Sequence, residues 1–187
     1  AKPDRITIGS VAHEPVPSRT ELDSHANMVV LGKNCLCLTK GTKMARVAAF
    51  SPTLEPMDIP IVDACVCWIN PISDKKHFLF FEDALYVEQM DHNLIPPFVL
   101  REAGWIVNDV ARIHTNNVTE STHSLVLEED HLLIPLSLKG VFSYFTTVAP
   151  THREFTLATD PFCHHMTPRD YDWNPNVDSY AIAEDSY

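Results

Sequence analysis

A single acidic residue precedes an apolar run in the segment RTELDSHANMVVLG, which covers residues 19–32. Asp23 stands there between the apolar Leu22 and the small hydroxyl residue Ser24. Because Asp, Ser and Asn are frequent turn formers, Asp23 can be a turn or cap residue. Alternatively, its carboxylate takes part in acid–base chemistry on a peptide bond, in which one carboxylate activates a water and a second donates a proton to the carbonyl oxygen.

The chemical interpretation requires a second carboxylate, because two carboxylates that share one proton can act as base and acid together. One motif supplies one carboxylate, so the pair requires a symmetric dimer in which Asp23 meets its mate across a two-fold axis. Residues 177–181, VDSYA, echo the pattern. They lie in a Pro- and Asp-rich tail with no strand after them, and we do not expect them to supply the second carboxylate.

The cysteines are the other candidates for chemistry. Cys35 and Cys37 form one C-x-C pair, and Cys65 and Cys67 form another. Residues two apart in a strand share a face, so two such strands side by side would allow two disulfides or a four-thiolate zinc site. The C-x-C spacing and the chain length favour reduced core thiols over disulfides, and disulfides over a metal. We expect no metal and no cofactor, and we predict that the two pairs lie on adjacent strands.

The segment Cys163-His164-His165 has the composition of a metal-ligand cluster. Side chains of adjacent residues diverge, however, so we interpret this segment as a coincidence of sequence.

Length and composition favour one compact domain. The chain has 187 residues, of which 45% are apolar and 21% charged. A net charge of −11 disfavours nucleic acid as a partner. No apolar run approaches the roughly 20 residues that span a bilayer, so we expect no membrane partner. The chain begins at Ala1, from which we expect a processed product or an excised domain. Its ten His would bring the net charge close to zero near pH 5, so acid should favour self-association.

Period-two patterns dominate the segments that must position these residues. Apolar residues alternate in 6–8, 35–38 and 64–68, and residues 77–87 are apolar and aromatic enough for one or two strands. Fourteen Pro leave few windows for helices. One short helix is predicted at 97–103, with Pro in its first turn and Gly after its end. The sequence therefore predicts a mainly β fold.

The clearest pattern is HLLIPLSLKGVFSYFTTV, residues 131–148. Alternate apolar residues from Leu132 to Leu138 share one face, Lys139-Gly140 offers a tight turn, and alternate residues from Phe142 to Val148 continue the pattern. We predict a β-hairpin here, with Pro135 at an edge or a bulge because it cannot donate a ladder hydrogen bond.

Three segments in this order, ELDSHANMVVLGKNC, DIPIVDAC and DALYVEQMDHNLIPPFVLREAGWIV, resemble the aspartic-protease (retropepsin-like) region of copia-type retrotransposon Pol polyproteins. In that family an Asp-Ser-Gly-Ala turn is followed by a strand, an H-N-L-L segment and a helix that ends in Gly. Residues 84–87, 92–95 and 100–104 match these parts. The chain looks closest to a divergent lineage with Leu-Asp-Ser-His-Ala, and the likeness covers residues from about 19 to 178.

The resemblance implies a retropepsin-like domain, a closed β-barrel or sandwich, at residues 19–160, with the hairpin as a C-terminal extension. An N-terminal strand or arm would occupy residues 1–18, and an irregular acidic tail residues 161–187. The implied activity is peptide-bond hydrolysis by a homodimer, with a peptide or polyprotein as substrate.

The resemblance also assigns roles to the residues of the turn. Asp23 would be the catalytic carboxylate, and Ser24 would hold the two loops together across the dimer. The Asp-Ser-Gly-Ala pattern of the family has no His at this position, where His25 would either act as a cation that lowers the pKa of Asp23 or as a proton shuttle, or point away on a rearranged turn. Ala26 and Asn27 would contact the substrate.

Two departures from the family pattern touch this machinery. His25 replaces a Gly that lets substrate and the partner loop approach the backbone, so its side chain crowds the dimer centre unless the turn is rearranged. Pro96 cannot donate the backbone hydrogen bond expected from the segment that supports the loop. Residues 49–60 are the substitute for a glycine-rich flap. These changes favour a retained fold with degenerate catalysis over full activity.

A second interpretation is a non-catalytic structural or assembly subunit, a homo-oligomer that resembles a filament or capsid component. The N-terminal segment DRITIGSVA, residues 4–12, could add to the sheet edge of a neighbour. Asn117 begins an N-x-T sequon, which matters if the chain is secreted. A retroelement product would be cytoplasmic, and an assembly subunit of this kind extracellular.

Overall fold

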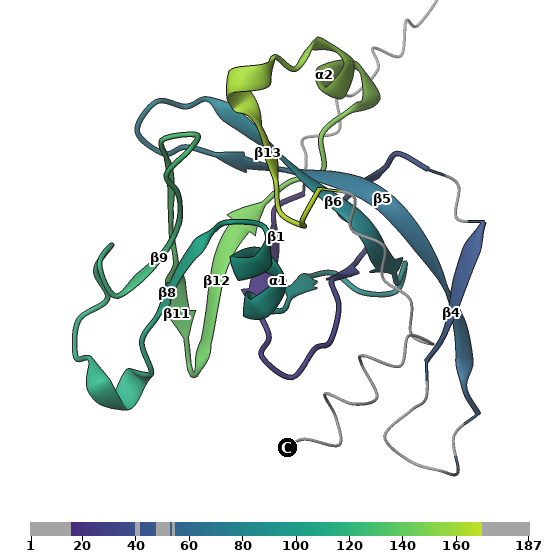
Figure 1. The fold of residues 1–187 in the computed structure, drawn as a ribbon, viewed down its shortest axis with the longest axis horizontal. Coiled ribbons are helices and arrows are strands. Elements are labelled where there is room, and N and C mark those ends of the chain that lie inside the picture. Colours follow the sequence, from purple (N-terminus) through teal and green to yellow (C-terminus); the bar gives the residue numbers. More distant parts are fainter. Residues whose placement is uncertain (1–15, 40–41, 48–52, 54, 170–187) are drawn as a thin grey trace, which may run out of the picture.

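The computed structural model describes residues 16–39, 42–47, 53 and 55–169 (Figure 1). Within them 46% of the residues lie in strands and 12% in helices, which confirms the mainly β fold. The strands are β1 (Ser18–Leu22), β2 (Val30–Leu31), β3 (Leu36–Cys37), β4 (Lys43–Val47), β5 (Met57–Ile69), β6 (Lys76–Tyr86), β7 (Asn93–Ile95), β8 (Ile106–Asp109), β9 (His123–Leu127), β10 (Leu132–Pro135), β11 (Ser137–Lys139), β12 (Phe142–Thr147) and β13 (Cys163–His165). The helices are α1 (Pro97–Glu102), α2 (His152–Leu157) and the 3-10 turns η1 (Arg112–His114) and η2 (Asp160–Phe162).

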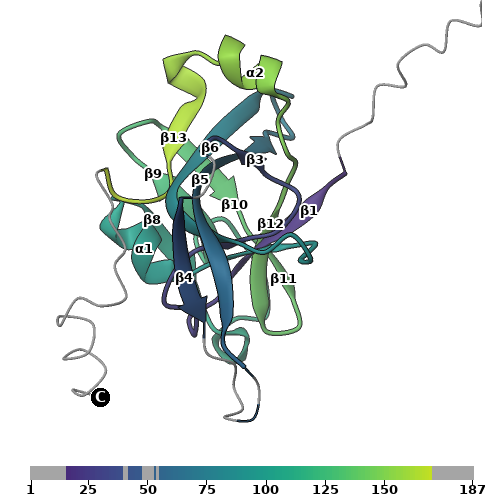
Figure 2. The same ribbon diagram turned by 90° about the vertical axis from the view of Figure 1, so that its right-hand side faces the viewer.

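The larger sheet has ten strands and is built around the β5–β6 hairpin. Its strand order is β11-β12-β1-β7-β2-β6-β5-β3, with β13 paired to β6 and β4 paired to β5. Figure 1 shows β4 and β5 running together away from the body of the molecule, and Figure 2 shows the two strands side by side. The smaller sheet has the order β10-β9-β8.

The expectation of a closed barrel is wrong for the described strands. Cys67 and Val148 exchange two backbone hydrogen bonds of 2.8 and 2.9 Å, which join β5 to the chain just after β12. This contact is a single bridge, because the two strands are not paired over a continuous ladder. The larger sheet therefore curls toward itself without closing.

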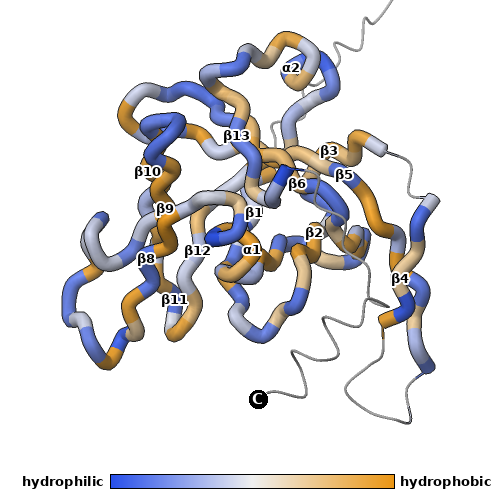
Figure 3. The backbone as a smooth tube through the Cα atoms, in the orientation of Figure 1, coloured by the Kyte–Doolittle hydropathy of each residue, from blue (hydrophilic) through white to orange (hydrophobic). Residues whose placement is uncertain are grey.

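One hydrophobic core joins the two sheets. It contains Val66 and Trp68 of β5, Leu79 of β6, and Leu125 and Ile134 of the smaller sheet. Figure 3 shows hydrophobic residues along β5 and along β9 and β10, where these residues lie. Because side chains alternate along a strand, the opposite face of β5 and β6 carries a second cluster, formed by Cys65, Cys67, Phe78 and Val148.

The predicted hairpin at residues 131–148 is only partly correct. β11 and β12 do form a hairpin, with Gly140 at a φ of 63° in its turn. The segment before it leaves the hairpin, since β10 ends at Pro135 and pairs with β9 at the edge of the smaller sheet. The edge position of Pro135 is thus confirmed, and the continuous strand from 132 to 138 is wrong.

The predicted face of β12 is also wrong. Phe142 is 54% exposed, whereas Ser143, Phe145 and Thr147 are buried. Polar side chains tolerate burial when they are hydrogen-bonded. Ser143 donates to Asp109 Oδ1, and Thr147 Oγ1 lies 2.7 Å from the hydroxyl of Thr20, so both find partners on this face.

The helix predicted at 97–103 is confirmed as α1, followed by Gly104 at a φ of 94°. A second short helix, α2, was not predicted, so the expectation of a single helix is wrong. Thr151 and Glu154 form a capping box at its start, in which each side chain binds the backbone N–H of the other. The T-x-x-E spacing was the sequence signal for this helix.

Several expectations fall on residues outside the described ranges. They concern the N-terminal strand around residues 6–8, the echo at 177–181 and most of the C-terminal tail. Within the segment expected to be irregular, residues 163–165 form β13 against β6. No helix among the described residues is long and apolar enough to span a membrane.

Candidate functional site

Asp23 begins the turn that joins β1 to β2. Its backbone N–H donates to the carbonyl of Ile95 at 3.0 Å, and its own carbonyl accepts from the N–H of Ala26 at 3.3 Å. Its carboxylate Oδ1 accepts from the N–H of His25 at 2.9 Å. This is an Asx turn, in which a side chain replaces a backbone acceptor. Asp23 is therefore a turn residue, and it is partly exposed, with its carboxylate held in place by the bond from the N–H of His25.

The strand β7 clamps both sides of this turn. It lies between β1 and β2, parallel to β1 with Leu22 opposite Ile95, and antiparallel to β2 with Val30 opposite Leu94. A strand fixed to both flanks limits how far the turn can move. The loop that carries Asp23 is therefore mounted on the sheet.

Pro96 does not weaken this support in the way that the sequence led us to expect. The hydrogen bond between the two segments runs from the N–H of Asp23 to the carbonyl of Ile95, so it needs no donor at residue 96. Pro96 instead precedes α1, where a missing N–H costs little.

His25 also fits the turn without backbone strain. Its φ is not positive, since the described non-glycine residues with positive φ are Asp74, Asp83 and His131. The N–H that binds Asp23 is present whatever the side chain, so Gly is not needed for this bond. In the single chain the imidazole is exposed. Any crowding by His25 would therefore arise between two chains or with a substrate.

A buried polar network lies behind the turn. Asn93 is fully buried, and its Oδ1 accepts from the N–H of Gly32 at 2.9 Å. Its Nδ2 donates to Thr20 Oγ1 at 3.1 Å, and Thr20 Oγ1 lies 2.7 Å from Thr147 Oγ1. These contacts tie β1, β7 and β12 to the chain after β2. Sequence reasoning missed the network, although a polar residue directly before the apolar pair Leu94-Ile95 was its signal.

Gly32 approaches the backbone of a neighbouring segment closely. A Cβ at this position would lie 2.3 Å from the carbonyl oxygen of Met90 and 2.9 Å from that of His92. The next residue, Lys33, donates its N–H to the same Met90 oxygen at 2.9 Å. Only Gly fits here, because a side chain would separate the two segments.

The predicted site residues are thus adjacent on one turn. Ser24, His25 and Asn27 are exposed, whereas Asp23 and Ala26 are partly exposed. The base of the β4–β5 hairpin packs beside them, because Met28 shares a buried cluster with Ala45, Ile61 and Leu85. Residues 49–60, the expected substitute for a flap, follow β4 and extend into β5; of these, 49–52 and 54 lie outside the described ranges.

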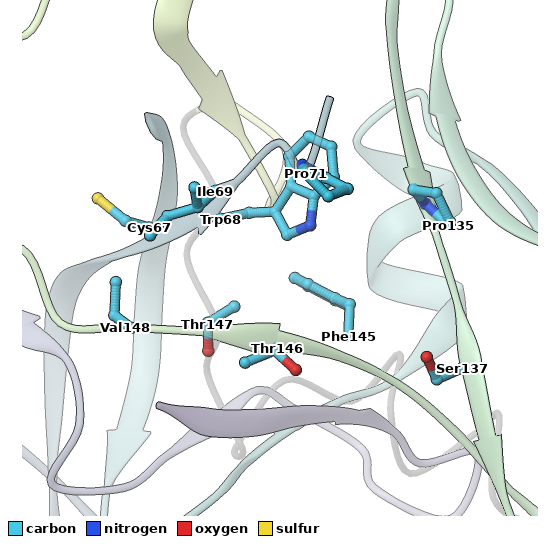
Figure 4. A pocket seen from close by; sticks show the side chains of 10 residues that line it. All are labelled: Cys67, Trp68, Ile69, Pro71, Pro135, Ser137, Phe145, Thr146, Thr147 and Val148. Carbon is cyan, nitrogen blue, oxygen red and sulfur yellow. The ribbon is translucent and has the colours of Figure 1, made fainter. Parts of the chain in front are cut away.

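A cavity lies elsewhere, between the end of β5 and β12. It has a volume of about 320 Å³, and none of residues 23–27 lines it. Figure 4 shows Trp68 and Phe145 projecting toward it from the two strands, with Pro71 and Pro135 at its rim. The cavity is therefore separate from the Asp23 turn.

The prediction that the two C-x-C pairs lie on adjacent strands is confirmed for three of the four residues. Cys37 lies on β3, Cys65 and Cys67 lie on β5, and Cys35 directly precedes β3. β3 pairs with β5, with Leu36 opposite Cys65 and Cys37 opposite Ala64. All five cysteines are free thiols. Burial raises the pKa of Cys67 to about 12 and also raises the pKa of Cys65, so both remain protonated and poorly nucleophilic at neutral pH.

Two further findings concern metals and family relationships. Among the described residues, no three His, Cys, Asp or Glu side chains are grouped so that they could hold a metal ion. No family model, curated protein or solved structure matches this chain.

Proposed function

We propose that this chain is an aspartic-protease-like domain derived from a copia-type retroelement, in which Asp23 occupies the place of the catalytic carboxylate and His25 suppresses catalysis. The observation that carries the proposal is the fixed position of the Asp23 carboxylate on its turn. A partly exposed carboxylate is fixed by an N–H two residues later, on a turn whose flanks are both paired to β7.

In an active dimer, two such turns would face each other across a two-fold axis. The two Asp23 carboxylates would share one proton; one would activate a water and the other would protonate the carbonyl oxygen of the peptide bond. Ser24 would hold the two loops together across the dimer. Ala26 and Asn27 follow on the same turn, where a substrate backbone would pass.

His25 decides whether this chemistry occurs. Its side chain is exposed in the single chain, so dimer formation would bring two imidazoles to the place that substrate and partner loop need. We therefore expect the dimer to be inert or nearly so. The fold of the turn is unaffected, because the bond from the N–H of His25 to Asp23 does not depend on the side chain.

The test compares the wild-type chain with Asp23→Asn, His25→Gly and the double variant, at pH 4 to 7, on an unfolded protein substrate. We expect the wild type and Asp23→Asn to be equally inert. His25→Gly should gain cleavage in mild acid that pepstatin inhibits and that Asp23→Asn removes. His114→Gly, at an exposed His outside the turn, is the control. Pepstatin-sensitive cleavage by the wild type would show that His25 is compatible with catalysis, and the absence of any dimer would refute the proposal.

A second function, a non-catalytic assembly subunit, is favoured by exposed apolar side chains on the projecting hairpin. Met44 of β4 is 53% exposed and Met57 of β5 is 62% exposed, and β4 pairs with β5 on one side. Uncovered apolar residues on an edge strand suit contacts with another copy. Analytical ultracentrifugation distinguishes the two functions: Met44→Lys should dissociate an assembly subunit and leave a dimer formed through the Asp23 turn intact.

A further inference from the structure

Three titratable side chains from distant parts of the chain form a continuous hydrogen-bonded row, here called the histidine relay (Asp130, His164 and His77). Asp130 lies in the turn between β9 and β10, His164 in the middle of β13 and His77 near the start of β6. Asp130 Oδ2 lies 2.7 Å from His164 Nδ1, and His164 Nε2 lies 2.9 Å from His77 Nδ1. The His164 side chain is 1% exposed.

The relay joins β13 and β6 of the larger sheet to the β9–β10 turn of the smaller sheet. β13 runs parallel to β6, and the β9–β10 turn belongs to the smaller sheet. Further contacts make β13 a connection between layers: the N–H of Met166 donates to the carbonyl of Phe80 at 2.8 Å, and Trp105 Nε1 donates to the carbonyl of His165 at 2.8 Å. Movement of β13 would therefore affect both sheets and the α1–β8 segment.

The geometry limits how many protons the relay can hold. Because the Asp130 carboxylate is an acceptor, His164 Nδ1 carries a proton. One proton occupies the gap between His164 Nε2 and His77 Nδ1. A first additional proton is accommodated on His77 Nε2 at the end of the row, where every hydrogen bond is kept. A second would place an N–H on both sides of the 2.9 Å gap, so the two rings would repel each other.

The surroundings of His77 also oppose the addition of protons to the relay. Burial, the neighbouring His164 and the cationic Lys75 all lower the pKa of His77. Its ring also lies between Trp68 and Phe162, with centroid distances of 5.5 and 5.4 Å. The other charged groups nearby are Lys76, which is paired with Glu154, and those that line the small cavity at Asp130, namely Glu129, His165 and Arg169.

The folded chain therefore binds fewer protons in acid than the unfolded chain, because the pKa of His77 is lower in the folded chain. A His whose pKa is lower in the folded state loses stability as the pH falls below its unfolded value. This loss of stability is local, because His164 and His77, whose rings would repel each other, join β13 to β6.

We propose that the histidine relay is an acid-sensitive latch that holds β13 between the two sheets and releases it when a second proton enters. Release would uncover apolar side chains that β13 helps to bury, including the fully buried Met166. It would occur as protonated His reduce the net negative charge that keeps copies apart. The inference does not depend on the role of Asp23.

Hydrogen exchange of individual amides tests the latch at pH 7.5 and pH 5.0, after correction for the intrinsic rates. The protection of Met166 should fall at least about tenfold relative to amides in the β5–β6 ladder, which is the effect of one pKa unit. His77→Gln should abolish this difference, because an amide can turn either its donor or its acceptor toward His164. The control is His114→Gln, at an exposed His outside the relay.

A direct measurement on the wild-type chain does not depend on the variants folding. The ring nitrogen resonances of His77 and His164 should report a single added proton shared by the pair between pH 7.5 and 5. Two independent titrations near pH 6.5 would overturn the latch. It would equally be overturned if Met166 kept its protection in acid, or if His77→Gln lost that protection as the wild type does.

Discussion

The substitution Gly32→Ala tests whether the Asp23 turn is rigidly supported. The added Cβ would lie 2.3 Å from the carbonyl oxygen of Met90, so the two segments must separate by most of an ångström. Separation weakens the hydrogen bonds from Lys33 to Met90 and from Gly32 to Asn93, both of 2.9 Å.

The magnitude follows from these contacts. Overpacking costs about 1–3 kcal/mol, and each weakened buried hydrogen bond adds about 1 kcal/mol. The lower entropy of the unfolded Ala chain returns about 0.4–1 kcal/mol. The net loss in the free energy of unfolding should therefore be about 2–5 kcal/mol.

Urea unfolding followed by tryptophan fluorescence measures this loss. Gly140→Asn is the matched control, because a Cβ added at Gly140 would meet no atom within 4 Å and Asn tolerates its positive φ. It should cost less than about 1 kcal/mol. If Gly32→Ala costs no more than this control, the chain after β2 yields easily and the turn is not rigidly mounted.

Three further outcomes are expected. Asn93→Leu should destabilise the fold by about 1–3 kcal/mol in urea unfolding, because the Gly32 N–H loses its buried acceptor; a neutral result would show that the network is dispensable. In the native chain Cys37 should react with a thiol reagent long before Cys67, and equal rates would contradict the observed burial. Glu154→Gln should cost less than about 1 kcal/mol at pH 7, since its partner Lys76 is 38% exposed. Lys76 lowers the pKa of Glu154, so this difference should vanish as the pH falls below about 4.5, and a difference that persists at pH 3 would exclude the ion pair as its cause.

Local patterns were sufficient for several features of this protein. Within the described residues the period-two segments contain strands, the Pro at the start of 97–103 and the Gly after it bound a helix, and Cys37 lies on a strand next to that of Cys65 and Cys67. The Asp-Ser sequence formed the turn that these residues favour. Each of these features depends on contacts between residues close in sequence, or on one alternation that is readable along a single strand.

Only the tertiary structure decided which strands pair. Nothing in residues 93–95 indicated that they would lie between β1 and β2. Pro135 indicated an edge or a bulge within residues 131–148, but not that the segment would divide there between two sheets. Alternation shows that a strand has a buried face, but the identity of its partner depends on loop closure and on side chains far away in the chain. The prediction of which face of β12 is buried was wrong for this reason, because the buried Thr147 has its hydrogen-bond partner, Thr20, far away in the sequence.

The same distinction separates the two candidate sites. Asp23 was found from its own neighbours, because a turn is local. The histidine relay was not, because Asp130, His164 and His77 come from three separate segments. In the sequence Cys163-His164-His165 is a run of adjacent residues whose side chains diverge, and that part of the interpretation holds for β13. Folding brings a carboxylate and a second imidazole to the buried face of His164, since a polar group excluded from water must find its partners within the protein.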